Sequence, residues 1–451
     1  MPSLTPPGQV AAREATARLG AWAADLTWGD VPQEVRDRLG LVLLDSLGVT
    51  VAGARQSEQR SLVRAWDVAP GPAPLLGGGA VTTVEAAAWL NTTALVGLEL
   101  DEGHKYAKGH PAAHGLHAVL ALAAATGASG EDTLTALLVG YEVAARFGRA
   151  TALRAGAHPH GSWGVAGAAA GCARLLELDA EATAAAIDAG AGLPVAGHFS
   201  TALDGNPVRN AWMGASNLSG LAAARMAAAG VARNTGTAAG SLGELLGAFD
   251  PAELTGGLGD RWDIQHGYFK QHAACSFTHP AADAVLDLRD RIGDPSRVED
   301  VLVETHSLAA GLTRTAWDTQ LAALFSTPFV VATALVHGAV SPDQSDEHSR
   351  HDPAVAALAE RVRVEVAPDL EARLPSERAA RVTVRAGGTV LQAEVPNPRG
   401  DADHHPFGEA EVMILLRTIL DPATATAVHD VVTALPAAAD VAPLLTELAS
   451  V

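Results

Sequence analysis

Apolar positions recur at intervals of three to four residues through most of residues 8–265, the spacing that is typical of amphipathic helices. One of these helices starts near Asp30, a favoured capping residue, and Pro32, which suits a first helical turn. Its apolar face is formed by Val35, Leu39, Leu43, Leu44 and Leu47. Residues 164–178 carry glycine and alanine on most faces, which suits a helix packed closely on several sides. The pattern therefore predicts a large all-helical domain.

After about residue 270, apolar and polar residues alternate, as they do in half-buried strands. The segments VEDVLVETHS, RVRVEVAP, RVTVRA and TVLQAEV show this alternation. Gly387-Gly388 lies between the last two segments and predicts a hairpin turn. Helices are expected among these strands at 279–291 and 322–338, so the region predicts a smaller α+β domain.

Helical patterns return after Phe407, and the last helices are expected to rejoin the first domain. The connecting segment PNPRGDADHHPF is rich in proline and glycine, as a hinge would be. The predicted fold class is therefore mainly α, a large all-helical domain with a smaller α+β lid domain. The predicted limits are 1–267 for the first part of the helical domain, 268–396 for the lid and 397–451 for the terminal helices.

Composition and charge narrow the classes of function. Hydrophobic residues make up 48% of the 451 residues and aromatic residues only 4%, so the core is expected to consist mainly of Ala, Leu and Val. The formal net charge of −20 argues against binding to nucleic acid or to an anionic membrane. The two cysteines, Cys172 and Cys275, match no metal-binding spacing. The start, MPSLTPPGQV, lacks the features of a signal peptide, and we expect a cytoplasmic protein without membrane spans.

Acid–base side chains are densest at 99–117, where the chain reads ELDEGHKYAKGHPAAHGLH between two apolar helical stretches. A polar segment between helices that must be mostly buried predicts a functional site. His110, His114 and His117 have the spacing i, i+4, i+7, which could place three imidazoles on one helical face as metal ligands. One catalytic histidine beside two packing histidines is the favoured interpretation, and no metal site is predicted.

Several motifs occur in an order that is similar to one known family. They are LLDSLGVTVAG near the start, an acidic pair followed by His110-Pro111, SGEDTLTALLVGYEVAARFG, GAHPHGSWGVAGAAAGCARLLELD, GNPVRNAWMG, YFKQHAACSFTHPAADAV and NPRGDADHHP. On these motifs the chain resembles the 2-methylcitrate dehydratase (MmgE/PrpD) family, which includes cis-aconitate decarboxylase and iminodisuccinate epimerase. The resemblance implies a helical domain with an α+β lid, an active site between them, a homodimer, a small carboxylic-acid substrate and no metal or organic cofactor.

The resemblance also implies site residues. Asp101, His110, His158 and Lys270 match catalytic positions of the family, and Arg209 stands where the decarboxylase and the methylcitrate enzymes have a lysine. Each also has a structural alternative: Asp101 as a helix cap, the two histidines as partners of backbone groups, and Arg209 and Lys270 as solvated surface charges.

Four further positions bear on substrate binding. Glu102 flanks the acidic motif, and His104 lies with two lysines in a segment slightly longer than is usual in the family. Phe329 in LFSTPF replaces a tyrosine of the decarboxylase, and Gly103 replaces a threonine of its site. Arginine stays protonated near neutral pH, so Arg209 cannot act as a base. These departures make cis-aconitate itself an unexpected substrate.

The leading prediction is a cofactor-independent lyase that dehydrates a small hydroxylated carboxylic acid. His158 or Lys270 would remove a proton, His110 or Asp101 would assist the departure of hydroxide, and Arg209 would hold a carboxylate. The alternatives are an epimerase of the iminodisuccinate type, a decarboxylase of a related acid, a metal-dependent hydrolase and a non-catalytic relative.

Overall fold

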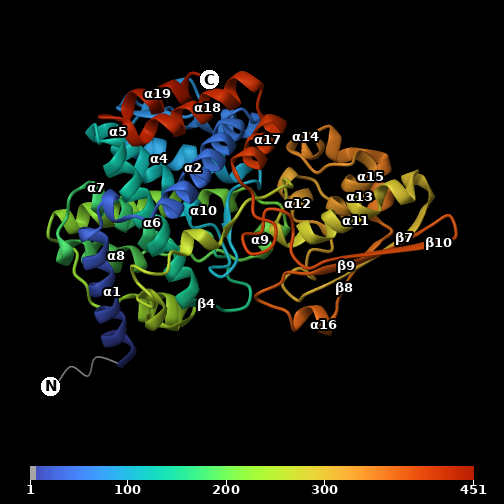
Figure 1. The fold of residues 1–451 in the computed structure, drawn as a ribbon, viewed down its shortest axis with the longest axis horizontal. Helices are drawn as coiled ribbons and strands as arrows, with labels where there is room; N and C mark the ends of the chain where they lie inside the picture. The colour runs from blue at the N-terminus through green and yellow to red at the C-terminus, as the bar shows by residue number, and fades with distance from the viewer. Residues whose placement is uncertain (1–6) are drawn as a thin grey trace.

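The computed structural model describes residues 7–451, and helices make up most of the first 230 residues (Figure 1). Helix starts are set by side chains that accept backbone N–H groups, as Ser129 does from Asp132 and Asp179 from Ala182. The helices of this part are α1 (Pro7–Asp25), α2 (Gln33–Ala54), α3 (Ser57–Trp66), α4 (Val84–Gly97), α5 (Leu116–Thr126), α6 (Gly130–Ala150), α7 (Val165–Leu175), α8 (Ala180–Ala191), α9 (Ser200–Leu203) and α10 (Val208–Ala228).

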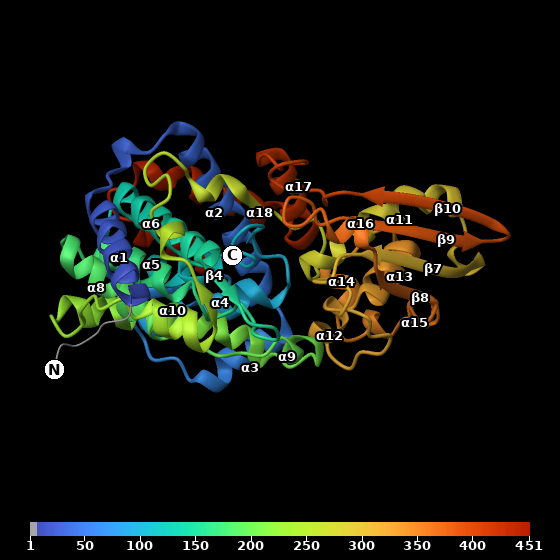
Figure 2. The same cartoon turned by 90° about the horizontal axis from the view of Figure 1, so that it is seen from below.

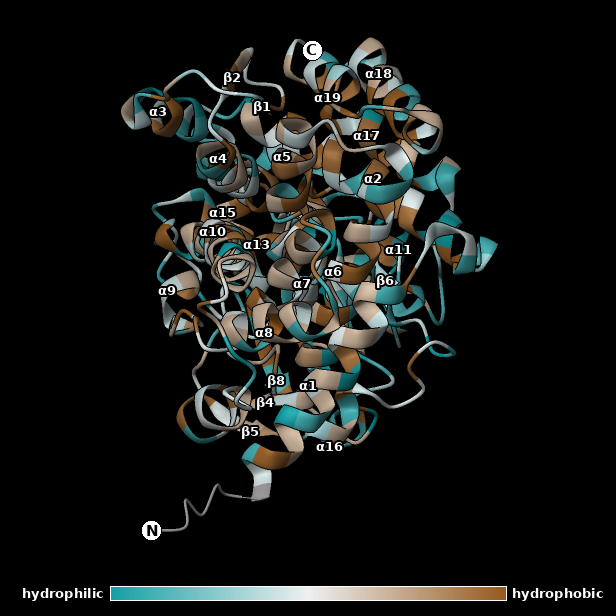
Figure 3. Ribbon diagram, turned by 90° about the vertical axis from the view of Figure 1, so that its left-hand side faces the viewer, coloured by the Kyte–Doolittle hydropathy of each residue, from teal (hydrophilic) through white to brown (hydrophobic). Residues whose placement is uncertain are grey.

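Small residues let α7 pack against several helices at once. It contacts α5, α6, α8 and α10, as its content of glycine and alanine predicted. A Cβ atom at Gly167 would lie 2.4 Å from the carbonyl oxygen of Gly140 on α6, so the two backbones meet without side chains between them. Outer helices such as α1 show both apolar and polar colours in Figure 3 because only one face is buried.

The chain ends in three helices that pack on the first helices. They are α17 (Glu409–Ile419), α18 (Pro422–Ala434) and α19 (Ala442–Ala449). Helices α17 and α18 contact α2, and Figure 1 shows the last helices in red over α2 in blue. Leu416 packs on Gly48, where an added Cβ would lie 2.3 Å from the leucine side chain. The terminal helices therefore lie against one of the first helices of the chain.

A four-stranded sheet forms the second part of the molecule, which projects to one side of the helices (Figure 2). Its strand order is β10-β9-β7-β8, in which β7 pairs parallel with β8 and antiparallel with β9. The strands are β7 (Val298–Thr305), β8 (Val362–Val366), β9 (Ala380–Ala386) and β10 (Thr389–Val395). Gly387 and Gly388 both have positive φ and form the predicted hairpin turn between β9 and β10.

Helices α11 and α13 pack on this sheet, α11 on β9 and β10 and α13 on β8. The helices of this part are α11 (His279–Ile292), α12 (Gln320–Leu324), α13 (Thr327–His337), α14 (Pro342–Ser345), α15 (Pro353–Ala359) and α16 (Pro368–Glu371). The single helix expected at 322–338 is instead two helices. The break has a local cause, because Ser326 accepts the N–H of Phe329 and Pro328 stands in the first turn of α13.

The two parts have separate apolar clusters. Most buried apolar residues up to Ala273 and again from Val412 form the larger cluster, and most of those from Ala274 to Leu391 form the core around the sheet. A small third cluster joins Ala202 to Leu321, Leu324 and Phe325. The fold is therefore mainly α with a smaller mixed part, while the lid and the domain limits stay predictions. Within residues 7–451 no helix has the length and apolar character that crossing a bilayer requires. Residues 1–6, which belong to the segment used to predict the absence of a signal peptide, lie outside the described residues.

Three two-stranded ladders complete the structure. They are β1 (Ala73–Leu75) with β2 (Ala80–Thr82), β3 (Gly103–His104) with β6 (Gly267–Tyr268), and β4 (Thr151–Leu153) with β5 (Gly247–Phe249). The β3–β6 ladder connects the acidic segment after α4 with the segment that leads into the sheet part.

Candidate active site

The acidic segment follows α4 directly, and its first residue turns the chain. Glu99 has a left-handed backbone with φ of 53°, a conformation that costs a residue other than glycine about 1–3 kcal/mol. The chain then enters β3, which pairs with β6, and Lys270 follows β6 closely. This ladder brings Asp101 and Lys270 together although they are far apart in sequence.

Two buried cations meet two buried carboxylates at this point. The Nζ atom of Lys270 lies 3.3 Å from a carboxylate oxygen of Glu99 and 3.3 Å from one of Asp101. Arg209, in the first turn of α10, pairs with the other oxygen of Glu99. All four side chains are only about 1% exposed. Burial alone would lower the pKa of Lys270, but Asp101 and Glu99 outweigh it and raise that pKa above its ordinary value. Lys270 is therefore a cation rather than a ready base.

The hydrogen bonds of His110 determine which ring nitrogen is free. Its Nδ1 lies 2.6 Å from the carbonyl oxygen of Glu102 and 3.0 Å from Oδ2 of Asp101. Both neighbours are acceptors, so Nδ1 carries the proton and Nε2 keeps its lone pair. Burial lowers the pKa of His110, against the opposing charge of Asp101, so the ring is neutral near pH 7. Such an imidazole can accept a proton at Nε2.

His158 has the opposite tautomer. The backbone N–H of His160 donates to Nδ1 of His158 at 3.1 Å, so the neutral ring carries its proton on Nε2. Burial, together with the charge of Arg209, lowers the pKa of His158 well below its ordinary value. The turn depends on Gly161, whose φ is 75° and where an added Cβ would lie 2.7 Å from the carbonyl oxygen of Trp212. His158 can therefore donate a hydrogen bond from Nε2.

Contacts link these groups into a closed circuit. His160 packs edge-on against His110 and His158, with ring centroids 5.2 Å and 4.5 Å apart. His158 stacks on Phe199 at 5.2 Å. The ring of Phe325 closes the circuit, since it lies 5.3 Å from the guanidinium of Arg209. We call the whole set the acid–base circuit. Its members, in order, are Arg209, Glu99, Lys270, Asp101, His110, His160, His158, Phe199 and Phe325.

The circuit contains the four predicted catalytic residues and Arg209, but not the other predicted substrate-binding residues. The carboxyl of Glu102 accepts the hydroxyl of Tyr141 at 2.6 Å and the N–H of Ala112 at 3.3 Å. Burial raises the pKa of Glu102 to about 8, against the hydrogen bond from Tyr141. Phe329 packs against Trp317 at 4.8 Å within the core of the sheet part.

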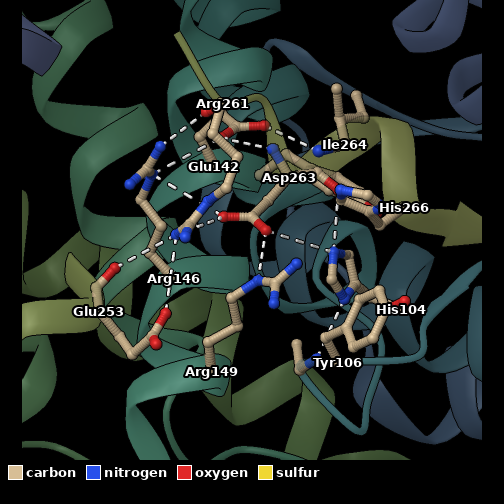
Figure 4. Close-up of polar contacts among 12 residues, drawn as sticks. His104, Tyr106, Glu142, Arg146, Arg149, Glu253, Arg261, Asp263, Ile264 and His266 are labelled. Carbon is tan, nitrogen blue, oxygen red and sulfur yellow. Dashed lines mark hydrogen bonds and ion pairs between the residues drawn. The ribbon is translucent and has the colours of Figure 1, made fainter. Parts of the chain in front are cut away.

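His104 belongs to a different polar cluster, shown in Figure 4. Its Nε2 lies 2.9 Å from the carbonyl oxygen of Asp263, and its Nδ1 accepts the N–H of Ala107 at 3.0 Å. Both nitrogens are thus engaged by the protein itself. Burial lowers the pKa of His104 to about 3, so this histidine is neutral and structural in its bonding.

Three side chains of α6, those of Glu142, Arg146 and Arg149, hold the same cluster together. Glu142 accepts the N–H groups of Asp263 and Ile264 at 3.0 Å and 2.8 Å, and Arg149 pairs with the carboxylate of Asp263 (Figure 4). Arg146 donates to the carbonyl oxygen of Arg261 at 2.7 Å. The cluster therefore fixes the segment just before β6, and with it the start of the strand that leads to Lys270.

The row of three histidines on one helical face, the less favoured interpretation of their spacing, does not form, because the chain is irregular at His110 and α5 begins only at Leu116. His114 bonds Ser216 through Nδ1 at 2.8 Å, and His117 contacts the hydroxyl of Thr50 through Nε2 at 2.9 Å. Across residues 7–451, no group of three or more His, Cys, Asp or Glu side chains has an arrangement that could hold a metal ion.

Two buried residues were not singled out from the sequence. Asp45 lies in α2, within LLDSLG, and burial together with the charges of Glu102 and Asp101 raises its pKa well above the ordinary value. The sequence feature that could have pointed to Asp45 is a single acidic residue on the apolar face of a helix. The ring of His160 contacts both His110 and His158, the two predicted catalytic histidines. Its place two residues after His158 was the sequence feature that could have pointed to it.

Family models support the likeness seen in the motifs. The model of the MmgE/PrpD N-terminal domain matches residues 17–254, and that of the MmgE/PrpD C-terminal domain matches residues 272–431. Together they span most of the chain.

Curated relatives carry related names. Cis-aconitate decarboxylase of Aspergillus terreus is 27% identical over 297 residues, which cover 61% of this chain and 60% of that protein. The chain thus spans about three-fifths of the length of these relatives. The cis-aconitate decarboxylase-like protein oryM of Aspergillus oryzae is 27% identical over 387 residues, covering 78% of this chain and 79% of that protein.

Proposed function

Since this chain belongs to the MmgE/PrpD family, we propose that it is a cofactor-independent lyase that dehydrates a small hydroxylated carboxylic acid with more than one carboxylate. One observation carries the proposal: a neutral imidazole with a free Nε2, His110, lies in the same buried circuit as the cations Lys270 and Arg209. Proton removal beside a carboxylate needs both a base and cations that stabilise the enolate-like charge that develops.

His110 is the proposed base. Its Nε2 takes the proton from the carbon next to a substrate carboxylate. The carboxylate of Asp101, whose Oδ2 lies 3.0 Å from Nδ1, stabilises by its negative charge the imidazolium that forms. The C–O bond of the neighbouring carbon then breaks, the carbon–carbon double bond forms, and Nε2 returns the proton to the leaving hydroxide. The products are an unsaturated acid and water, and His110 is neutral again.

Lys270 and Arg209 are the proposed carboxylate-binding groups. The raised pKa of Lys270, which Asp101 and Glu99 cause against the effect of burial, favours a fixed positive charge there. The terminal nitrogens of Arg209 contact Glu99, Asn210 and the carbonyl oxygen of Val96, while its Nε has no partner among the described residues, so its charge and this N–H would attract a carboxylate. His158, neutral and with its proton on Nε2, would donate a hydrogen bond to a substrate oxygen as charge develops on it. The base role thus moves from His158 or Lys270, as first expected, to His110.

Decarboxylation of a related acid is the second candidate, and the names of the Aspergillus relatives favour it. Epimerisation would need only the proton-transfer half of the same chemistry. A homodimer, as the family resemblance implies, is part of the proposal and can be tested by light scattering.

Incubation of the purified protein with a panel of di- and tricarboxylic acids in deuterated buffer separates these reactions. Loss of water gives a vinyl proton signal in the NMR spectrum, decarboxylation releases carbon dioxide, and epimerisation incorporates deuterium without either change. A vinyl product without carbon dioxide supports the main proposal. No product and no exchange with any acid, from a protein that is folded, would contradict it.

A further inference from the structure

His160 is buried with both ring nitrogens unsatisfied. It is 1% exposed, and neither Nδ1 nor Nε2 has a hydrogen-bond partner among the described residues. Leaving a buried polar group without a partner costs about 1–3 kcal/mol, and buried polar groups in folded proteins are nearly always bonded. A partner for His160 is therefore missing from the chain itself.

The position of His160 indicates where that partner would lie. Its ring contacts His110, whose Nε2 is the free base, and His158, whose Nε2 carries a proton. The cations Lys270 and Arg209 follow on the other side of the circuit, joined through Glu99. A substrate that reaches Nε2 of both His110 and His158 would also lie beside the ring of His160, which contacts both of them.

The chemistry of the ring selects the kind of group. Burial, with the charge of Arg209, lowers the pKa of His160 well below its ordinary value, so the ring is neutral. A neutral imidazole offers one donor and one acceptor. A hydroxyl also offers one of each, whereas a carboxylate only accepts and is better served by the cations.

We infer that His160 binds the substrate hydroxyl that lies next to the acidic carbon, and so selects hydroxylated acids over their deoxy analogues. This inference rests on the proposed function, and it gives His160 a role in substrate binding rather than in proton abstraction.

His306 offers a matched control within the same chain. It too is buried, and neither ring nitrogen is bonded, but its ring packs on Phe277 at 5.7 Å. Among residues 7–451 no hydrogen bond, ion pair or ring–ring contact joins His306 to a member of the acid–base circuit. Replacing either histidine with phenylalanine keeps a ring and removes both nitrogens. Only the replacement at His160 should change recognition of a hydroxyl.

Calorimetric titration tests this with two pairs of acids that differ by one hydroxyl, citrate against tricarballylate and malate against succinate. The unmodified protein should bind the hydroxylated member about 3- to 10-fold more tightly, the value of one neutral hydrogen bond. His160→Phe should bring this ratio to about one, His160→Gln should keep part of it, and His306→Phe should leave it unchanged. Thermal melting confirms that each variant is folded.

The outcomes separate the inference from the proposed function. Binding of both members with equal affinity by the unmodified protein, or an unchanged ratio in folded His160→Phe and His160→Gln, overturns the inference alone. If a folded protein binds none of the four acids, the proposed function fails and the inference fails with it.

Discussion

Nδ1 of His110 lies 3.0 Å from a carboxylate oxygen of Asp101, and the same nitrogen lies 2.6 Å from the carbonyl oxygen of Glu102. Two acceptors on one nitrogen leave the other nitrogen as the basic one. The Glu102 carbonyl oxygen and the Asp101 carboxylate together therefore set both the tautomer and the orientation of the His110 ring. Asp101 also pairs with Lys270, so one carboxylate holds the proposed base, His110, near a cation.

Replacement of Asp101 by asparagine should lower kcat by about 10²- to 10⁴-fold, because the amide removes the negative charge that would stabilise an imidazolium at His110 and that pairs with Lys270. Steady-state kinetics on the substrate found by the panel measures this. Asp352→Asn is the matched control: Asp352 lies 3.2 Å from His337 in a partly exposed pair, and asparagine can still cap α15. Equal losses in both variants would contradict the special role of Asp101.

Lys270→Arg should keep part of the activity if Lys270 acts as a fixed cation. The variant keeps the positive charge beside Glu99 and Asp101 but changes its shape, so KM should rise more than kcat falls. A base cannot be replaced by arginine, which stays protonated. Complete loss of turnover in a folded Lys270→Arg protein, with substrate binding retained, would instead point to Lys270 as the base.

Arg209→Gln should destabilise the protein by about 3 kcal/mol, because it leaves Glu99 with only one of its two cations in a buried site. Urea unfolding measures the change. The double variant Glu99→Gln/Arg209→Gln should recover most of the lost stability, since the uncompensated charge is gone. Substrate binding should stay weak in both variants. A double variant no more stable than the single one would contradict this account of the pair.

Stability should fall steeply below pH 6.5. Burial lowers the pKa of His104, His114 and His117 to about 3 in the folded state. Between pH 6.5 and 3 the unfolded chain therefore binds more protons, and each histidine lowers the free energy of unfolding by about 1.4 kcal/mol per pH unit as the pH falls. Urea unfolding at pH 7, 6 and 5 measures the slope. His117→Gln should reduce this slope by the contribution of one proton, about 1.4 kcal/mol per pH unit. His404→Gln, at an exposed site, should leave the slope unchanged.

Glu102 should have the opposite effect on the pH dependence of stability. Its folded pKa is raised to about 8, mainly by burial, so between pH 4.5 and 8 the unfolded chain loses a proton that the folded chain keeps. This carboxyl lowers stability by about 1.4 kcal/mol per unit of rising pH in that range. Glu102→Gln should remove the slope and make the protein more stable than the unmodified chain at pH 8. Glu365→Gln, on an exposed strand position, should change nothing.

The sequence supported the broad architecture because it depends on repeated local signals. Helical spacing predicted the helical part, and alternation with Gly387-Gly388 predicted the β9–β10 hairpin. The parallel pairing of β7 with β8 was not predicted, since it joins strands that are far apart in sequence and no turn marks it.

The residues that meet in the candidate site could be predicted only where they lie in motifs that resemble those of a known family. Asp101, His110, His158, Arg209 and Lys270 do meet in one circuit. His104 and Glu102 do not join it, because their side chains find partners on neighbouring elements, Asp263 and Tyr141, which no local pattern reveals. His160 was not predicted, because the feature that distinguishes it is the absence of a hydrogen-bond partner for either ring nitrogen, and only the three-dimensional structure shows this.

The β3–β6 ladder has a consequence for dividing the protein. The proposed proton acceptor and one of its two neighbouring cations come from opposite sides of this junction: Asp101 and His110 lie near its β3 strand, and Lys270 follows its β6 strand. A fragment that stops before β6 would carry Asp101, His110 and Arg209 without Lys270, and the remaining fragment would carry Lys270 without its two carboxylate partners. The two halves of this chain are therefore not exchangeable modules, and a chimaera with another family member must keep both strands of the ladder from the same parent.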